Sequence, residues 1–359
     1  MSITKKKERP HERVKRLFQQ EIAEHLPGDS LGTEMDLVRR FEVARMTVRK
    51  AVAALIAEGR VERRPGIGLF VRKNDSVTRR YRFIAANIVW SSSIQVGSAL
   101  RQAGQKIGST IELVEAGNDV TRFLAEIRKL PSEPHLNGAI IFSQHGEVFC
   151  QAVHEVEEKG FPLVLVDQQD ASAFQSICVA SDNYEGGKLA ARTFALAGHR
   201  RLAMIGDFDS DTVQARWEGF VKGAEEARIP KPQIYKLHKL DRLNDWSEQV
   251  GEVIERMLKL NQFPTAIFCS CDAVARHVAR FLTRAGYNLP KEISLIGFDD
   301  DPISEWTTPA LTTIRQDYTS MGEAALSALT RPRQKGPNTP ILIPVQLIER
   351  DSVRSRFED

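Results

Sequence analysis

The chain of 359 residues is too long for one ordinary domain and long enough to build two or three with apolar cores. It has no apolar run of about 18 residues, and no apolar segment follows its charged start, MSITKKKERPHERVKR, so we expect no membrane span and no secretory signal, but a cytoplasmic protein. Its net charge of +3 is divided unevenly, because residues 1–82 carry +9 and residues 83–359 carry −6, which predicts a nucleic-acid partner for the first part.

Two helices are predicted near the start of the chain. Apolar residues at helical spacing extend from Pro10 to Leu26, and a Pro-Gly pair follows them. Thr33, three residues before Asp36, predicts the N-cap of a short second helix that ends near Phe41. Both helices would support the helix that comes next.

The third predicted helix, ARMTVRKAVAALIA, places its apolar side chains on one stripe and its arginines on another. Arg45 and Arg49 lie one turn apart, and an arginine fork can bind guanine O6 and N7 in the major groove. Thr47 and Lys50 can take phosphates beside them. Taken alone, the pattern equally fits an ordinary amphipathic helix with a solvated basic face. The buried stripe is predicted to contain Val48, Ala51, Val52 and Leu55.

A two-stranded hairpin is predicted directly after this helix. Gly59 suits the end of the helix, and two short strands, 61–64 and 69–71, flank a Pro-Gly turn. Arg63 and Arg64, at that turn, would lie against a phosphate backbone or an adjacent minor groove. The order of helix, turn, helix and hairpin is that of a winged helix-turn-helix.

These elements resemble the winged helix-turn-helix of the GntR family of bacterial regulators. The resemblance covers about the first seventy residues, where PGDSLGTEMDLVRRFEVARMTVRKAVAALIAEGRVERRPGIGLFV matches the family's loop, short helix, recognition helix and glycine-containing wing. The residues that the resemblance assigns to base or phosphate contacts and to the wing tip are Arg45, Thr47, Arg49, Gly66 and Gly68. One departure is Met35, where members often carry an arginine that touches DNA, so the operator preference stays open.

Residues 72–82, RKNDSVTRRYR, are polar and basic without periodicity, and they predict a linker that can run along DNA. Strand-like apolar runs then alternate with helical patterns, which predicts an α/β fold with parallel sheets. The runs are FIAANIV, GAIIFS, PLVLV, RLAMIG, TAIFC and ISLIGF. We therefore expect a winged helix-turn-helix domain (1–73), a basic linker (74–82) and a large α/β domain (83–359).

The second half contains two motif-rich runs, VLVDQQDASAFQSICVASDNYEGGKLAARTFALAGHRRLAMIGDFDSDTVQARWEGF and PTAIFCSCDAVARHVARFLTRAGYNLPKEISLIGFDDDPISEWTTPALTTIRQD. Their order and spacing resemble the ligand-binding domain of the lactose/purine repressor (LacI) family. The resemblance implies a periplasmic-binding-protein-like domain of two lobes, with crossovers near 183, 314 and 335 and a small ligand between the lobes. A GntR-type head on a LacI-type body is similar to the arabinose-repressor (AraR) type of regulator.

A regulator of this type would bind a double-stranded DNA operator as a homodimer. Its two heads would meet half-sites about one helical turn, ~34 Å, apart or a multiple of it. LacI-type proteins usually carry a small-residue hinge helix after the DNA-binding domain, whereas the linker here is basic and lacks that pattern. Signal transfer to DNA would therefore differ from that of the lactose repressor.

Charged residues just after apolar strands mark the ligand side of open parallel sheets. Asp167, Asp272 and Asp299 follow PLVLV, TAIFC and ISLIGF. By resemblance, Arg216 in ARWEGF matches the family's ligand-binding arginine, and Asp167 and Asp299 match ligand-contacting acids. The alternative for each acid is a helix cap, and the alternative for Arg216 is a surface position.

Acids with one arginine suit a neutral monosaccharide or related polyol, because its hydroxyl groups donate to carboxylates and accept from a guanidinium. Trp90 would stack on a sugar face while the hydroxyls of Ser92 and its neighbours bond the sugar's edge, or would pack at the lobe interface. Cys271 stands where many members carry a ligand-binding asparagine, and a thiol is a weak substitute. A degenerate or non-sugar site therefore stays open.

Other functions find little support in the sequence. An enzyme would need a catalytic motif, and the chain has no P-loop, HExxH or GxSxG. A transport-type binding protein shares the two-lobed fold, but the DNA-binding head and the missing signal peptide argue against it. Four cysteines are present, and Cys269 and Cys271 alternate along a strand without a second pair, so we expect no metal and no cofactor. The sequence thus predicts an effector-controlled transcriptional regulator, with repression expected from the family.

Overall fold

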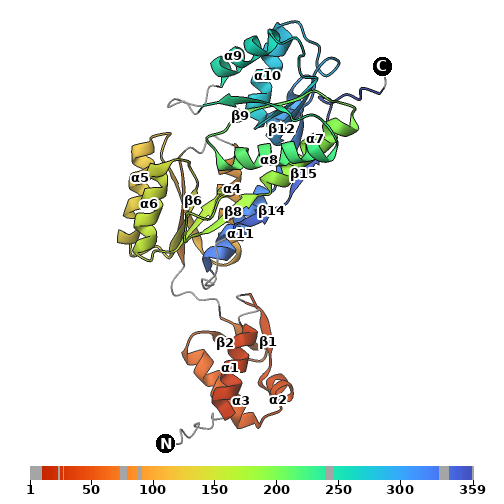
Figure 1. Ribbon diagram of the computed structural model, residues 1–359. Coiled ribbons are helices and arrows are strands. Elements are labelled where there is room, and N and C mark those ends of the chain that lie inside the picture. The colour runs from red at the N-terminus through yellow and green to blue at the C-terminus, as the bar shows by residue number, and fades with distance from the viewer. Residues whose placement is uncertain are drawn as a thin grey trace, which may run out of the picture. The chain divides into compact units, whose positions relative to one another are not determined.

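The computed structural model describes residues 10–22, 25–26, 28–72, 79–86, 91–238, 246–330 and 339–357 (Figure 1). The chain divides into two compact units, of which the first contains Met1–Arg79 and Gln105–Ser109 and the second contains Arg80–Gly104 and Thr110–Asp359. We call the described residues 10–72 the head and the described residues 79–357 the body. In neither of them does a described helix have the length and apolar character needed to cross a membrane.

The head packs three helices against a small antiparallel sheet within its described residues. Its elements are α1 (Pro10–Ile22), β1 (Ser30–Gly32), α2 (Glu34–Phe41), α3 (Arg45–Ala57), β2 (Val61–Arg64) and β3 (Gly68–Val71). The sheet order is β1-β3-β2, so the predicted hairpin gains a third strand. The sequence did not predict β1, because three residues are too few for the alternation of a strand to appear.

Two features of the head follow directly from the sequence. The predicted stripe of α3 (Val48, Ala51, Val52 and Leu55) is fully buried. Thr33 caps α2 as predicted, with its hydroxyl accepting from Asp36 N at 3.3 Å while the Asp36 carboxylate accepts from Thr33 N at 2.8 Å. The end of the first helix was predicted wrongly, because Leu26 is 61% exposed and donates its backbone N–H to the Asp29 carboxylate.

The body consists of two lobes, each built on a six-stranded sheet. The first lobe contains β4 (Arg80–Ala85), α4 (Ser91–Lys106), β5 (Thr110–Glu115), α5 (Val120–Lys129), η1 (Leu130–Ser132), β6 (Gly138–Phe142), α6 (Glu147–Glu158), β7 (Leu163–Val166), β8 (Ile177–Ser181), α11 (Tyr318–Thr330) and β14 (Ile341–Ile343). Its strands are all parallel, in the order β14-β8-β7-β6-β4-β5. The α/β fold with parallel sheets is thus confirmed in this lobe.

The second lobe has the same architecture with one reversed edge strand. It contains α7 (Asn183–Leu196), β9 (Leu202–Asp207), α8 (Asp211–Glu226), β10 (Gln233–Leu237), α9 (Ser247–Leu258), β11 (Ala266–Cys269), α10 (Asp272–Arg284), β12 (Ser294–Asp299), η2 (Pro302–Trp306), β13 (Thr312–Gln316) and β15 (Val345–Ile348). The strand order is β10-β9-β11-β12-β13-β15, with β15 antiparallel to β13.

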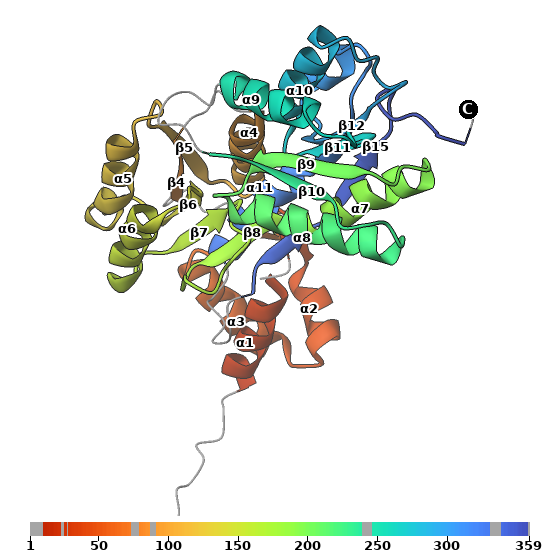
Figure 2. The same cartoon turned by 45° about the horizontal axis from the view of Figure 1, so that its top comes forward.

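Helices cover both faces of each sheet, which explains the near-continuous apolar strands. In the first lobe, α4 and α11 cover one face and α5 and α6 the other (Figure 1). In the second lobe, α9 and α10 cover one face, and α7 and α8 lie side by side on the other (Figure 2).

The chain passes between the lobes three times in the described residues. It does so at Asp182 between β8 and α7, at Asp317 between β13 and α11, and at Pro344 between β14 and β15. The predicted third crossover near residue 335 lies outside the described residues. The third crossover that the structure describes is at Pro344, later in the chain. Pro344, which cannot donate to a ladder, divides the ILIPVQLI run between two sheets.

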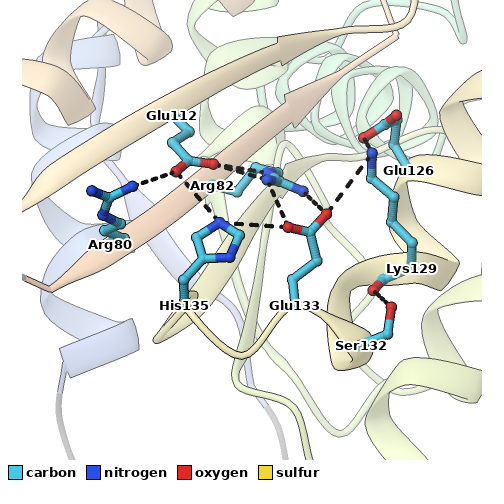
Figure 3. A network of polar contacts seen from close by, with 8 residues as sticks. All are labelled: Arg80, Arg82, Glu112, Glu126, Lys129, Ser132, Glu133 and His135. Atoms are coloured by element: carbon cyan, nitrogen blue, oxygen red, sulfur yellow. Dashed lines mark hydrogen bonds and ion pairs between the residues drawn. The ribbon is translucent and has the colours of Figure 1, made fainter.

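Part of the predicted linker belongs to the body instead. Arg80 to Arg82 begin β4, and the Arg82 side chain is 9% exposed. Its guanidinium donates to Glu112 and Glu133, at 2.8 Å in each case, and His135 Nε2 lies 3.4 Å from the Glu133 carboxylate (Figure 3). Arg82 is therefore committed to two acids of its own lobe and cannot run along DNA; the remaining residues of the predicted linker, up to 78, lie outside the described ones.

Candidate functional site

The exposed surface of the head carries the side chains that the sequence assigned to DNA. Arg45, Arg49 and Lys50 on α3 are exposed, and Thr47 is half-buried. The opposite face of α3 is locked into the core of the head. Helix α3 thus presents guanidinium and ammonium groups on a fixed support, which is the geometry that reading a major groove requires.

Glu34 joins the recognition helix to the wing, and the sequence analysis missed it. One carboxylate oxygen lies 3.8 Å from Arg49 Nε, and the other accepts from Arg63 Nη2. Glu34 is mostly buried, with 14% of its side chain exposed, while both arginines remain about half exposed. Linear spacing gave no sign of this contact, because the three residues belong to α2, α3 and β2.

The wing depends on two glycines for different reasons. Gly66 has φ +75° in a turn closed by Ile67 N donating to Arg64 O at 3.1 Å, a backbone that other residues adopt at a cost. Gly68 has φ +145°, and a Cβ there would lie 2.9 Å from Gly32 O, so β1 and β3 can approach only at a glycine. Arg64 stacks on Phe70 at 4.2 Å, which stiffens the hairpin.

In the body, reciprocal glycines bring α7 and α8 into close contact. A Cβ at Gly187 would overlap Arg216 O, and one at Gly219 would overlap Tyr184 O. The two helices therefore touch through their backbones. This approach places Arg216 of α8 beside Asn183, the first residue of α7.

Arg216 is a buried charged group that second-lobe residues hold in place. It is 5% exposed, its Nε donates to Asn183 Oδ1 at 2.8 Å and its Nη1 donates to Ser270 O. The guanidinium carbon lies 3.6 Å above the centre of the Phe298 ring. The alternative of a surface arginine is excluded, because second-lobe groups hold the cation in one orientation.

Two acids approach Arg216 from opposite lobes. Asp167 follows β7 of the first lobe with φ +62°, and burial raises its pKa while Arg216 opposes the rise. Asp299 ends β12 of the second lobe, and burial raises its pKa to about 7, again against the attraction of Arg216. Carboxyl groups held near a single cation can bind hydroxyl groups in either protonation state.

Gln316 connects this site to the crossovers. Its Nε2 donates to Asp299 Oδ1 at 2.7 Å and to the Tyr318 hydroxyl at 2.9 Å, while its Oε1 accepts from Ser181 Oγ at 2.6 Å. Ser181 and Gln316 end β8 and β13, the two strands that lead into crossovers. The sequence analysis missed both, although the same signal, a polar residue at the end of an apolar strand, would have found them. We call Asp167, Arg216, Asp299 and Gln316 the interlobe site.

Asp272 does not belong to this site. It is fully buried, and its carboxylate accepts from Asp301 N at 2.8 Å, Ser304 Oγ at 2.7 Å and Thr313 Oγ1 at 2.6 Å. These contacts tie α10 to β13 and to the loop after β12. The structure thus argues against the effector role predicted for Asp272, because a residue committed to three donors has no surface left for a ligand.

The remaining predicted contacts differ in their placement. Trp90 lies outside the described residues, and Ser92 is half-buried in the first turn of α4. Cys271 is half-buried beside Arg216 and Asp299, and burial raises the pKa of its thiol to about 12. Cys271 is therefore a neutral, weakly bonding group where a ligand would meet the second lobe.

Two family models match the chain. The bacterial regulatory proteins of the gntR family match residues 10–71, and the periplasmic binding protein-like domain matches residues 191–353. A gntR-family head joined to a periplasmic binding protein-like body defines the class of DNA-binding transcriptional regulators.

Relatives agree with this class. The transcriptional repressor PurR of Escherichia coli O1:K1 is 30% identical over 251 residues, which are 68% of this chain and 71% of PurR. The chain belongs to the LacI family of transcriptional regulators and carries a gntR-family head. Solved structures share the fold: a ribose-bound LacI-family regulator of Enterococcus faecalis V583 (25% identity, TM-score 0.63, 77% of this chain and 99% of that one) and CcpA of Lactococcus lactis (18%, 0.64, 77% and 100%).

Proposed function

We propose that the protein is a repressor whose affinity for its operator changes when a small neutral sugar binds at the interlobe site. The observation that carries the proposal is Arg216, which is buried, stacked on Phe298 and flanked by acids from both lobes. A ligand that contacts Asp167 and Asp299 together would favour one arrangement of the lobes. Such differential binding is what couples an effector to a distant site, at about 1–3 kcal/mol.

The chemistry of the site favours hydroxyl groups over charged ligands. An anion would meet two carboxyl groups and one cation that already donates to Asn183 and Ser270. A sugar hydroxyl can donate to a carboxylate and accept from a guanidinium at the same time. The ribose that the E. faecalis relative binds is a ligand of this kind and supports the same class here.

In the head, we assign operator contacts to Arg45, Thr47, Arg49 and Lys50 of α3 and to Arg63, Gly66 and Gly68 of the wing. Exposure of the basic groups on a rigid helix supports the first set, and the shape that the two glycines give the turn supports the second. Because its target is the chromosome, the proposal places the protein in the cytoplasm.

We also propose a homodimer, which would present two heads to a two-fold operator. Trp306 of η2 is 84% exposed and Ile303 of the same turn is 45% exposed. These two exposed apolar side chains are candidates for contacts at such an interface. Sedimentation velocity across a range of concentrations tests the dimer, and a monomer at micromolar concentration would contradict it.

The direct test of the effector is thermal stability against a panel of pentoses, hexoses and disaccharides. A sugar at one hundred times its dissociation constant adds ~2.7 kcal/mol to the native body, which raises its melting temperature by several degrees. The same sugar should change operator affinity measured by fluorescence anisotropy. A panel without any shift would favour the second candidate, a regulator with a degenerate or non-sugar site, for which the thiol of Cys271 is the specific observation.

A further inference from the structure

Asp211, the first residue of α8, reaches from the second lobe to the first. Its Oδ2 accepts three hydrogen bonds, from Gln168 Nε2 at 2.8 Å, from Gln169 N at 2.9 Å and from Asp170 N at 2.8 Å. All three donors belong to the loop that follows β7 in the first lobe. A single carboxylate oxygen therefore holds a loop of the opposite lobe.

Two further contacts reach the first lobe from the same side. Asn183 Nδ2 donates to Gln169 Oε1 at 2.9 Å, while Asn183 Oδ1 accepts from Arg216. His145 Nδ1 lies 3.6 Å from Asp211 Oδ1, an oxygen that makes no hydrogen bond to any part of the chain that the structure describes. The loop is thus tied to both α7 and α8.

The loop begins directly after Asp167, so its position bears on the position of Asp167. Asp167 is the residue between β7 and Gln168, and it has the left-handed backbone noted above. Backbone hydrogen bonds hold the turn on both sides: Asp167 N donates to Val179 O at 2.8 Å within the first lobe, and Gln169 N and Asp170 N donate to the Asp211 carboxylate of the second lobe. Hydrogen bonds to a charged acceptor are the strong ones, and the Asp211 side chain is only 22% exposed.

We propose that Asp211 is the positioning residue of the interlobe site: it clasps the 168–170 loop, holds Asp167 opposite Arg216 and keeps the two lobes together before an effector arrives. The inference rests on the proposed function only where it speaks of an effector. Contacts that hold the lobes together before the effector binds reduce the conformational entropy that binding must remove. They therefore raise the affinity for the effector and reduce the conformational change that the effector causes.

Hydrogen exchange of the full-length, ligand-free protein tests the clasp directly. In Asp211→Ala we expect the amides of Gln169 and Asp170 to exchange about 10- to 100-fold faster, the range for losing a hydrogen bond to a charged group. The amide of Asp167 should keep its protection, because its acceptor is Val179 O within the first lobe. Asp211→Asn, which keeps one acceptor oxygen, should restore part of the protection.

Glu218→Gln is the matched control, because it removes one negative charge from the exposed side of the same helix. Cys271 lies beside Arg216 and Asp299 of the interlobe site, so its alkylation reports how accessible that site is. We expect about 10-fold faster alkylation in Asp211→Ala and no change in Glu218→Gln.

Unchanged exchange at Gln169 and Asp170 would overturn the clasp, and faster exchange without faster alkylation would overturn its role in holding the lobes together. Neither readout needs a sugar, so an error in the proposed effector class would leave both outcomes interpretable.

Discussion

The head leaves Arg45 and Arg49 in solvent, whereas the body buries Arg82 and Arg216 among fixed acceptors. Arg49 has a single acid at 3.8 Å and keeps 56% of its side chain exposed. Arg82 and Arg216 are less than a tenth exposed, and each donates to two different residues.

This difference in exposure distinguishes arginines that can bind a partner from arginines that stabilise the fold. An exposed guanidinium contributes little to folding, since water satisfies it equally well, and its donors remain available to a partner. A buried guanidinium has its donors assigned by the fold, so removing it leaves its acceptors without a partner. Arginine therefore has a binding role in the head and a structural role in the body.

The largest effect is expected for Arg49→Ala. Loss of one bidentate base contact costs about 1–3 kcal/mol, and a dimer loses it twice, so specific operator binding should weaken by ~2–6 kcal/mol. Fluorescence anisotropy with an operator selected from random DNA measures it. The melting temperature of the head should stay within the error of the measurement, and Arg284→Ala, an exposed arginine of the body, serves as the control. Unchanged operator affinity would contradict the proposal that α3 contacts the bases of the operator.

Arg82→Ala should destabilise the body by about 3 kcal/mol, the lower end of the range for breaking a buried pair, because Glu112 and Glu133 are partly exposed. Urea unfolding followed by circular dichroism measures the loss. Arg80→Ala removes a neighbouring exposed arginine that lies 3.8 Å from Glu112 and should cost less than about 1 kcal/mol. Equal losses in the two variants would show that the buried Arg82 contributes no more to stability than the exposed Arg80.

Asp299→Asn should show a pH-dependent gain in stability. The folded-state pKa of Asp299, about 7, lies above the ordinary value of a carboxyl group, so wild type loses stability from this group as pH rises from ~4 to ~7. The neutral variant avoids that loss and should exceed wild type by about 1–2 kcal/mol at pH 8. This gain is smaller than the ~4 kcal/mol of the whole pKa difference because an amide, with two N–H donors in place of one O–H, fits the site less well than the protonated carboxyl group. The advantage should shrink by pH 5; a constant difference in urea unfolding would contradict the elevated pKa.

The smallest effect is expected for Glu34→Gln. Its partners Arg49 and Arg63 are about half exposed, so the free energy of unfolding of the head should change by less than about 1 kcal/mol. Removing this acid from between two arginines should strengthen binding to random-sequence DNA by less than about tenfold. Weaker binding would indicate that Glu34 contributes more by orienting the arginines than it costs by its charge.

The local pattern of the sequence predicted most helices and strands and much of the structure of the head. The stripe on α3, the capping of α2 by Thr33 and the wing strands are encoded by neighbours a few residues apart, so spacing alone predicts them. The alternation of apolar strands and helices likewise determined the α/β class of the body, and Asp167 and Asp299 followed from the rule that ligands lie beyond strand ends.

Contacts between distant segments were decided only by the tertiary structure. Whether a polar residue at a strand end serves a ligand or the fold depends on which donors surround it, so Asp272 and Asp299 look alike in sequence and differ once Ser304 and Thr313 reach Asp272. Basic residues before β4 likewise suggest a linker until Glu112 and Glu133 enclose Arg82. Spacing along the chain records neighbours within one element, whereas burial and charge pairing depend on elements that meet only after folding.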